Sequence, residues 1–241
     1  MSHCALLLCL GCIGATWMAA QSALPEVEIT SEAHHHLAFQ NPYVRVFNVE
    51  VDPNTQTEMH WHRHDYIAIT LGDAEVSNTV KNKPTVSVKL HDGDTVFASG
   101  NFAHYVADIG PQPFRNVTVE ILQDASLRNS AASGKIHWDE ERGLDILDRG
   151  TKEILFVKDG VRVTEFELQP GGVVPAHRYA GPHLLVAVTD FDLHEDSVRD
   201  DIKPLPIHFQ SGDHKWLPAG YSHTVTNTGT TPAKFVTLEF P

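Results

Sequence analysis

The chain has 241 residues and a formal net charge of −13, from 18 basic and 31 acidic side chains. This acidic balance argues against a surface that attracts nucleic acid or anionic lipid, and solubility is its simplest meaning. The length is sufficient for two packed cores.

Residues 1–23 are predicted to be a secretory signal, because Ala5 to Trp17 form an apolar run followed by small residues. The run is too short to span a bilayer as a stable helix. The first residues contain no Lys or Arg, so an uncleaved anchor or a lipid-modified Cys12 is the alternative. All cysteines fall inside this segment (Cys4, Cys9 and Cys12). We therefore expect a secreted or periplasmic protein that has no disulfide and no membrane association after cleavage.

Short strands are expected throughout residues 24–125. Apolar residues alternate or cluster in short runs that Gly, Pro, Asn and Asp interrupt, a pattern typical of a jelly roll or barrel. The expected strands lie at 39–50, 67–71, 76–80, 85–90, 95–98, 105–107 and 117–122. Ahead of them, His34-His35-His36 is interpreted as part of a solvated arm rather than as a metal-binding tract.

The most informative stretch runs from Glu58 to Tyr66. His60, His62 and His64 occupy alternate positions, and a β-strand points alternate side chains to one face. A further histidine, His104, follows the next glycine-bounded strand. Neutral imidazole is the commonest side-chain ligand for transition metals. The pattern therefore predicts a metal site built by neighbouring strands.

Residues 126–150 are predicted to be a linker. The segment from Ser126 to Gly134 is small and polar, and acidic residues mix with leucines in Trp138 to Leu147. The second part is expected to form one short helix that packs against a second domain starting at Thr151.

That second domain repeats the first. Val44-Arg-Val46 recurs as Val161-Arg-Val163, His60 recurs as His177, and His104 recurs as His223. The repeat is longer than solenoid units of roughly 20–50 residues. It indicates two related domains, 24–125 and 151–241, of an ordinary size of about 100 residues. It also favours His60 over His64 as a ligand, since only His60 has a counterpart.

The C-terminal half carries Gly171-x5-His177-x-Tyr179-x3-His183 and Gly212-x5-Pro218-x-Gly220-x2-His223-x3-Asn227. These resemble the two signature motifs of the cupin superfamily, G-x5-H-x-H-x3,4-E-x6-G and G-x5-P-x-G-x2-H-x3-N. The N-terminal half keeps the spacing of the second motif with altered residues, namely Gly93, Ser99, Asn101, His104 and Asp108. The chain thus resembles a bicupin, which implies an all-β fold of two double-stranded β-helix (jelly-roll) barrels in tandem.

The resemblance also implies two sets of metal ligands. In the first domain the set is His60, His62 and His104. The glutamate position of the family is Tyr66 here, so the carboxylate ligand is missing. In the second domain the set is His177, His183 and His223. There Tyr179 replaces the second histidine of the motif, and a decayed site is the alternative.

A site of three neutral imidazoles leaves a cation with its full double charge and open coordination positions. This suits a chelating substrate together with O2, or a coordinated water of lowered pKa. Imidazole does not distinguish among Fe, Mn, Ni, Cu and Zn. Tyr66 and His64 are the candidate acid–base residues, although Tyr66 can equally be an aromatic residue of the barrel wall.

The resemblance implies two chemistries, because the cupin family contains O2-activating iron sites of three histidines and manganese cupins that cleave cyanohydrins. We predict a secreted metal-dependent oxygenase of the dioxygenase type, acting on a small organic substrate. The alternatives are a non-oxidative lyase or isomerase, and a non-catalytic protein that binds or stores small molecules. One fold hosts many functions, so the motifs alone do not choose.

Overall fold

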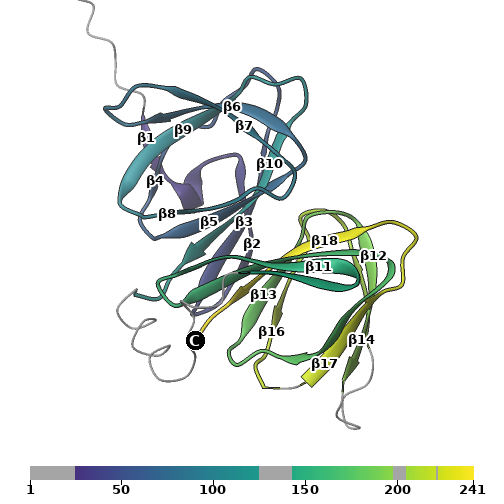
Figure 1. Ribbon diagram of the computed structural model, residues 1–241. Helices are drawn as coiled ribbons and strands as arrows, with labels where there is room; N and C mark the ends of the chain where they lie inside the picture. The colour runs from purple at the N-terminus through teal and green to yellow at the C-terminus, as the bar shows by residue number, and fades with distance from the viewer. Residues whose placement is uncertain (1–24, 125–142, 198–204, 221) are drawn as a thin grey trace, which may run out of the picture.

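The computed structural model describes residues 25–124, 143–197, 205–220 and 222–241 (Figure 1). Within these residues the fold is all-β, as predicted, and the helical structure is one short 3-10 turn, η1 (Ile29–Ser31). No helix in the described part is long and apolar enough to cross a bilayer. The predicted signal segment lies outside the described residues and stays a prediction.

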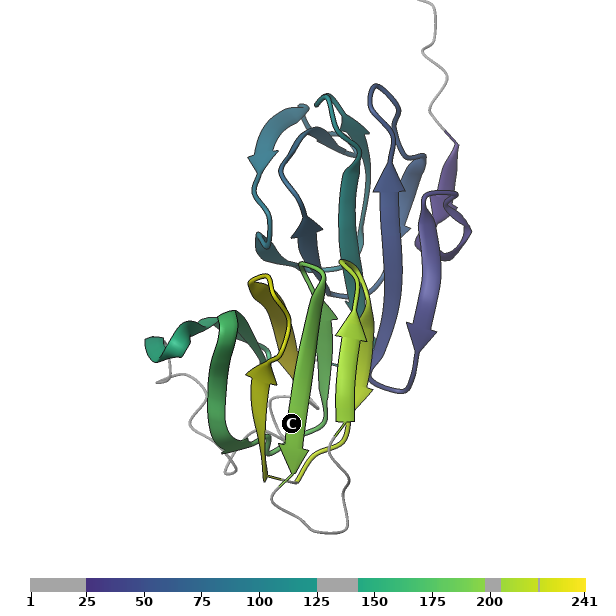
Figure 2. The same ribbon diagram turned by 90° about the vertical axis from the view of Figure 1, so that its right-hand side faces the viewer.

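The N-terminal half consists of two five-stranded sheets. The first has the order β1 (Glu26–Glu28), β4 (Met59–His62), β9 (Phe102–Asp108), β6 (Ala74–Val80), β7 (Val86–Leu90). The second has the order β2 (His35–Gln40), β3 (Val44–Val51), β10 (Phe114–Ile121), β5 (Tyr66–Leu71), β8 (Thr95–Ala98). The N-terminal strands, drawn in purple, run along one flank of this half (Figure 2).

The C-terminal half forms one eight-stranded sheet. Along its path the order is β15 (Leu205–Phe209), β14 (Phe191–Ser197), β17 (Ser222–Asn227), β12 (Val161–Arg178), β18 (Ala233–Glu239), β13 (His183–Ala187), β16 (His214–Leu217). The remaining strand, β11 (Leu144–Lys158), pairs with β12. The long strand β12 joins two groups of strands, because its first part pairs with β18 and its last part with β17.

The two halves repeat one strand order. The N-terminal sheets read β7-β6-β9-β4 and β3-β10-β5-β8, and the C-terminal sheet reads β15-β14-β17-β12 followed by β12-β18-β13-β16. A buried ion pair is repeated as well. Arg45 Nη1 lies 3.0 Å from Glu120 Oε2, and Arg162 Nε lies 3.7 Å from Glu239 Oε2. This explains why Val-Arg-Val is among the clearest matches in the sequence repeat.

The sheet that contains β3, β5 and β10 is buried on both faces. On β5, Ile67 and Ile69 belong to a cluster that also includes residues of the C-terminal half, such as Val163 and Leu238. The intervening residues Tyr66, Ala68 and Thr70 line a cavity inside the N-terminal half. Strands buried on both faces often read as nearly continuous apolar runs, as β5 does, whereas β3 and β10 alternate apolar with polar residues.

Aromatic residues seal the contact between the halves. The ring of Trp216 lies 5.2 Å from that of Tyr43 and 6.3 Å from that of Phe39. A lysine adds a polar link, because Lys234 Nζ donates to the carbonyl of Asp92 at 2.8 Å. The two halves therefore pack sheet against sheet through a shared core.

The prediction of a helix over Trp138–Leu147 is wrong for its described end, because Leu144 to Leu147 begin strand β11. The reason is tertiary pairing, since β11 continues as a long antiparallel partner of β12. Leu144 and Ile146 are also 57 % and 76 % exposed, so their apolar character does not report a buried helical face. The rest of the predicted linker lies outside the described residues.

Candidate metal centre

Strand β4 delivers two of the predicted ligands to the interior of the N-terminal half. His60 and His62 are each 1 % exposed, and His104 on the neighbouring strand β9 is 6 % exposed. His60 and His104 are direct partners in the antiparallel register of these strands. Their ring centroids lie 4.7 Å apart, and those of His62 and His104 lie 5.0 Å apart. The structure thus brings His60, His62 and His104 together, as the motif implies.

The separation of two ring nitrogens matches shared coordination. His62 Nε2 lies 3.1 Å from His104 Nε2. Two nitrogens bound at about 2.1 Å to one cation, and at right angles to each other, would lie about 3.0 Å apart. The pair is therefore already spaced as two adjacent corners of a coordination polyhedron.

The outer ring nitrogens are held by hydrogen bonds that free the inner ones. His60 Nδ1 lies 2.8 Å from the carbonyl of Glu58, and His104 Nδ1 lies 2.9 Å from Asn78 Oδ1. Both partners are acceptors, so each Nδ1 carries the proton and each Nε2 keeps its lone pair. His60 Nε2 is fully buried without a hydrogen-bond partner among the described residues. A buried acceptor without a partner is costly, and a bound cation would satisfy it.

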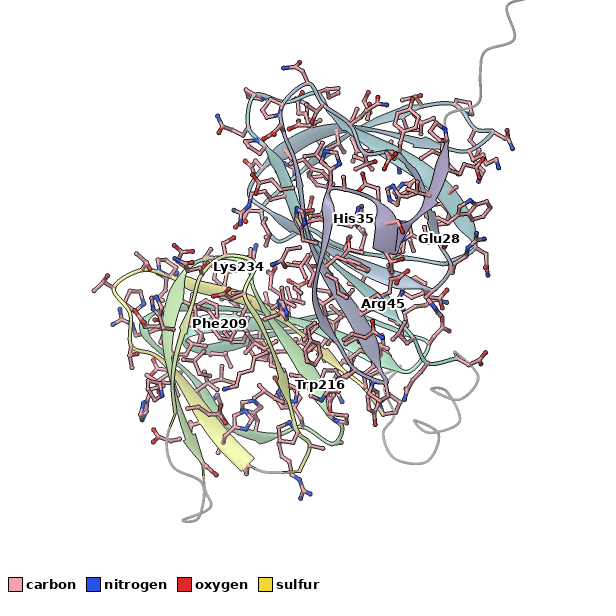
Figure 3. All side chains as sticks on the ribbon, turned by 180° about the vertical axis from the view of Figure 1, so that it is seen from behind. Glu28, His35, Arg45, Phe209, Trp216 and Lys234 are labelled. Carbon is pink, nitrogen blue, oxygen red and sulfur yellow. The ribbon has the colours of Figure 1, made fainter. Side chains whose placement is uncertain are left out.

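A fourth histidine joins the cluster from β2. The ligand atoms of His35, His60 and His62 all lie within 4.8 Å of one another, which among the described residues is the one such group. The His35 ring lies 4.6 Å from that of His60, and its side chain is 5 % exposed. Figure 3 shows His35 within the N-terminal half. The interpretation of this stretch as a solvated arm is therefore wrong for His35.

A buried carboxylate holds His35 in place. Glu32 Oε2 accepts hydrogen bonds from His35 Nδ1 at 2.6 Å and from the His34 amide at 2.9 Å. Glu32 Oε1 accepts from His34 Nδ1 at 2.9 Å and from the Glu58 amide at 3.1 Å. Burial opposes ionisation of Glu32, yet the hydrogen bonds from His35 and His34 outweigh it and lower the pKa of the carboxyl. The sequence contains one weak signal of this arrangement, an acid just before three consecutive histidines.

The two predicted acid–base residues differ in placement. The Tyr66 ring stacks on that of His62, with centroids 4.0 Å apart, and lines the cavity. Burial raises the pKa of Tyr66, so its phenol is a proton donor at neutral pH. The structure does not place His64 on the cavity wall or in the cluster, because β4 ends at His62. Burial, followed by the charge of Arg45, lowers the pKa of His64.

Burial favours the neutral form of His60, His62 and His104. Desolvation lowers the pKa of His60 to about 4 and that of His104 to about 3, and the neighbouring imidazoles add to the effect. It lowers the pKa of His62 as well. Metal binding requires neutral imidazole, so the site is ready to bind a cation well below neutral pH.

These pKa values predict an acid-sensitive metal-free protein. The folded pKa of His60 lies below the unfolded value of roughly 6.5, so its contribution to stability is present above about pH 6.5 and is lost as the pH falls toward 4. At pH 4.5 the loss from His60 alone is roughly 2 kcal/mol. Urea unfolding of chelator-treated protein at pH 7 and pH 4.5 measures it. The His60→Gln variant should lose less between the two pH values, and equal losses would contradict the assignment.

The C-terminal half repeats part of this arrangement. His177 pairs with His223 across β12 and β17 as His60 pairs with His104, and their rings lie 4.3 Å apart. Tyr179 stacks on His183 with centroids 3.6 Å apart. The enclosed space beside these rings is about 20 Å³, room for roughly one water molecule. The predicted ligands His177, His183 and His223 thus share a small pocket, with little space for a substrate.

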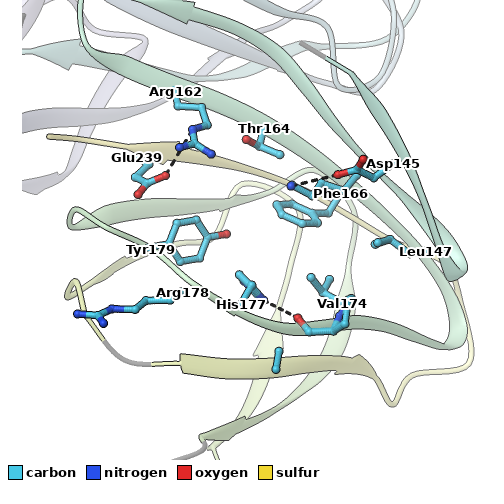
Figure 4. Close-up of a pocket in the computed structure, with 13 residues that line it drawn as sticks. Asp145, Leu147, Arg162, Thr164, Phe166, Val174, His177, Arg178, Tyr179 and Glu239 are labelled. Atoms are coloured by element: carbon cyan, nitrogen blue, oxygen red, sulfur yellow. Dashed lines mark hydrogen bonds and ion pairs between the residues drawn. The ribbon is translucent and has the colours of Figure 1, made fainter. Parts of the chain in front are cut away.

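A second hollow in the C-terminal half is also lined by His177 and Tyr179 (Figure 4). Its volume is about 190 Å³. Charged side chains of both signs line it and pair with each other, Arg162 with Glu239 and Lys152 Nζ with Asp145 at 3.2 Å. With Arg178, which also lines it, the hollow has three basic and two acidic side chains.

The N-terminal cavity is larger and lies against the histidine cluster. Its volume is about 240 Å³, and His35, His60, His62 and His104 line one end. Beyond the histidines, four residues on its walls are polar and buried, namely Thr57, Thr70, Asn116 and Thr118. A mostly apolar hollow with a few convergent polar groups is the usual form of a small-molecule site. Asn116-Val117-Thr118 has the form of a glycosylation sequon, but Asn116 is buried in the cavity wall and so is not accessible to modification in the folded protein.

Comparison with solved structures identifies the fold. A structure of Bacillus subtilis oxalate decarboxylase at pH 4.6 is 12 % identical, with a TM-score of 0.59 over 82 % of this chain and 68 % of that one. Another, from work on the Mn(II) centres of that enzyme, is 11 % identical, with a TM-score of 0.59 over 88 % of this chain and 76 % of that one. The chain has the cupin fold. No model of a known protein family matches the sequence, and no curated protein is similar to it.

The donor set is that of a divalent transition metal whose identity is open. The fit rests on the chemistry of the buried imidazoles and on the unsatisfied His60 Nε2. His60, His62, His104 and His35 would hold the ion.

Proposed function

We propose that this chain is a metal-dependent oxygenase of bicupin type, which binds a small organic substrate in the N-terminal cavity. One observation carries the proposal: three buried imidazoles, those of His35, His60 and His62, converge on the wall of a 240 Å³ cavity, with His104 beside them, and His60 Nε2 lacks a partner among the described residues. When bound, a redox-active divalent cation supplies Lewis acidity toward the substrate and electron transfer to O2.

The cavity wall favours oxidation over lyase or isomerase chemistry. A non-oxidative reaction needs a base near the substrate, and unless a metal-bound hydroxide serves, a side chain must supply it. The side chains that line the cavity include no Asp, Glu, Lys or Arg, and beyond the histidine cluster their one ionisable group is Tyr66. Burial raises the pKa of Tyr66, so this phenol does not serve as a base.

The side chains of this chain would bind and orient the substrate. The histidines would fix the position of the ion, and Glu32, Glu58 and Asn78 hold the outer nitrogens of His35, His60 and His104. Tyr66 would donate a hydrogen bond to a substrate oxygen close to His62. The apolar walls would exclude water from the reacting end, which strengthens these polar contacts.

We also retain three finer proposals. The shared strand order of the two halves supports two barrels in tandem. The tight pocket at His177, His183 and His223 supports, at most, a metal without a substrate in the C-terminal half. Secretion rests on residues 1–23 alone.

Oxygen uptake tests the function. The protein is reconstituted anaerobically with Fe(II), Mn(II) or Zn(II), its metal content is measured, and O2 consumption is followed as small diols, diketones, carboxylates and nitriles are added. We expect uptake with a redox-active metal and none with Zn(II). Turnover without O2 uptake would favour a lyase, and metal content well below one per chain would rule out a metalloenzyme.

A further inference from the structure

The walls of the N-terminal cavity are apolar away from the histidines. Most of the side chains there are aliphatic or aromatic and come from both sheets: Val49, Val76, Leu90, Val96, Val106 and Phe114. They lie between the polar end at the cluster and the edge strands β7 and β8. A ligand that reaches past the cation therefore meets hydrocarbon.

Several of the polar side chains among these walls already make hydrogen bonds within the protein. Thr57 Oγ1 accepts from the Val106 amide at 2.9 Å, and Thr118 Oγ1 donates to Asn116 Oδ1 at 2.7 Å. Asn78 Oδ1 is used by His104. Groups satisfied in this way attract a polar ligand weakly, because a new bond replaces an existing one.

The buried carboxylates Glu32 and Glu120 of the N-terminal half do not face the cavity. Glu32 is surrounded by four hydrogen bonds, and Glu120 pairs with Arg45 outside the cavity lining. A ligand with one anionic head could meet the cation, but a second charge further along would be buried without a partner. Burying an unpaired charge is strongly unfavourable.

The opening of the cavity is also apolar. Strands β7 and β8 are the edges of their sheets on the side opposite the N-terminal strands. Val88 on β7 and Val96 on β8 line the cavity, yet they are 38 % and 51 % exposed. Exposed apolar side chains around a hollow are typical of a binding site. An apolar molecule would thus enter between two valines.

We infer that the ligand of this cavity is an amphiphilic small molecule with a single oxygen-donor head at the histidines, an apolar body and no second charge. This deepens the proposed function and rests on it for the role of the head. At about 30 Å³ per water the cavity holds the volume of roughly eight waters, so the ligand has on the order of ten non-hydrogen atoms. Oxalate, which has no apolar body, would leave most of the cavity unused.

Calorimetry with alkyl hydroxamic acids tests the inference. These probes have one bidentate oxygen head, and Zn(II)-loaded protein binds them without turnover. From acetohydroxamic to hexanohydroxamic acid, affinity should rise roughly three- to fourfold for each added methylene. Oxalate and the monohydroxamate of adipic acid, which has a second charge, should bind more weakly than hexanohydroxamic acid. Affinity that does not depend on chain length would overturn the inference.

Two variants and one control localise the effect. Ala68→Phe fills part of the cavity and should reduce the gain in affinity per methylene, so that hexanohydroxamic acid loses more affinity than acetohydroxamic acid does. Val96→Glu should weaken hexanohydroxamic acid several-fold, whereas Val86→Glu should not, because Val86 is equally exposed, at 59 %, but does not line the cavity. Equal effects of the two glutamates would refute the proposed opening.

The failure of this inference is distinguishable from failure of the proposed function. The same titrations are run with metal-free protein, where the head loses its partner but the apolar walls remain. If affinity still rises with each added methylene in the metal-free protein, the inference that the ligand has an apolar body is supported even if the protein binds no metal. Full metal loading with no methylene gain would refute the ligand class and leave the oxygenase proposal standing.

Discussion

Replacing His60 with alanine is expected to remove the metal from the N-terminal half. Structural zinc sites bind with about 10–16 kcal/mol shared among four ligands, so one ligand accounts for roughly 3–4 kcal/mol, or an affinity loss on the order of 10²–10³. His60 is central to the cluster, since its ring lies within 5.1 Å of those of His35, His62 and His104. Metal content and competition against a chromophoric chelator measure the loss. His104→Ala should behave alike.

His64→Ala is the matched control for this experiment. It removes a histidine from the same stretch, but one that lies beyond the end of β4 and outside the cavity lining. Metal content should stay close to that of the parent. If His64→Ala removes the metal and His60→Ala does not, the ligand register is wrong.

The alternation of histidines predicted part of the site for a physical reason. A strand carries side chains to one face at every second residue, and β4 does so for His60 and His62. The alternation of side chains holds only within the strand, and β4 ends at His62. The amide of Asn101 donates to the carbonyl of His62 at 2.7 Å, and the chain then turns, so His64 does not continue the pattern.

His35 could not be found from local periodicity. Its position depends on the turn at η1 and on the parallel pairing of β1 with β4, where Val27 lies opposite His60. A parallel partner far away in the sequence leaves no trace in the spacing of nearby residues. The carboxylate missing at Tyr66 is thus partly replaced by Glu32, which acts through the ring of His35 and not as a direct ligand.

The cavity was equally invisible in the sequence. In β10 the residues Val117, Val119 and Ile121 pack toward the other half, while Asn116 and Thr118 face the cavity. Alternation predicts two faces but not which face is solvent, core or hollow. Only the packing of the two halves shows that the polar face of this strand lines a cavity.

Glu32→Gln should destabilise the protein and weaken metal binding together. The carboxylate accepts four hydrogen bonds, two at each oxygen, and its side chain is fully buried. Glutamine replaces one oxygen with a donor, which would then face two donors. Breaking a buried charged network of this kind costs about 3–5 kcal/mol. Loss of the group that orients a ligating histidine typically weakens metal affinity about 10–100-fold.

Glu28→Gln is the control for Glu32→Gln, because it removes a carboxylate from the same N-terminal arm. Glu28 pairs with Arg63 at 2.6 Å, but both side chains are 49 % exposed, and such pairs contribute about 0–1 kcal/mol. Urea unfolding and metal competition are measured on both variants. Glu32→Gln should lower both the free energy of unfolding and the metal affinity, whereas Glu28→Gln should change neither by much. A Glu32→Gln protein with parental stability and metal affinity would show that His35 is not held for the cation. If Glu32→Gln is unstable yet binds metal as tightly as the parent, the role of Glu32 is to anchor the N-terminal arm and not to orient a metal ligand.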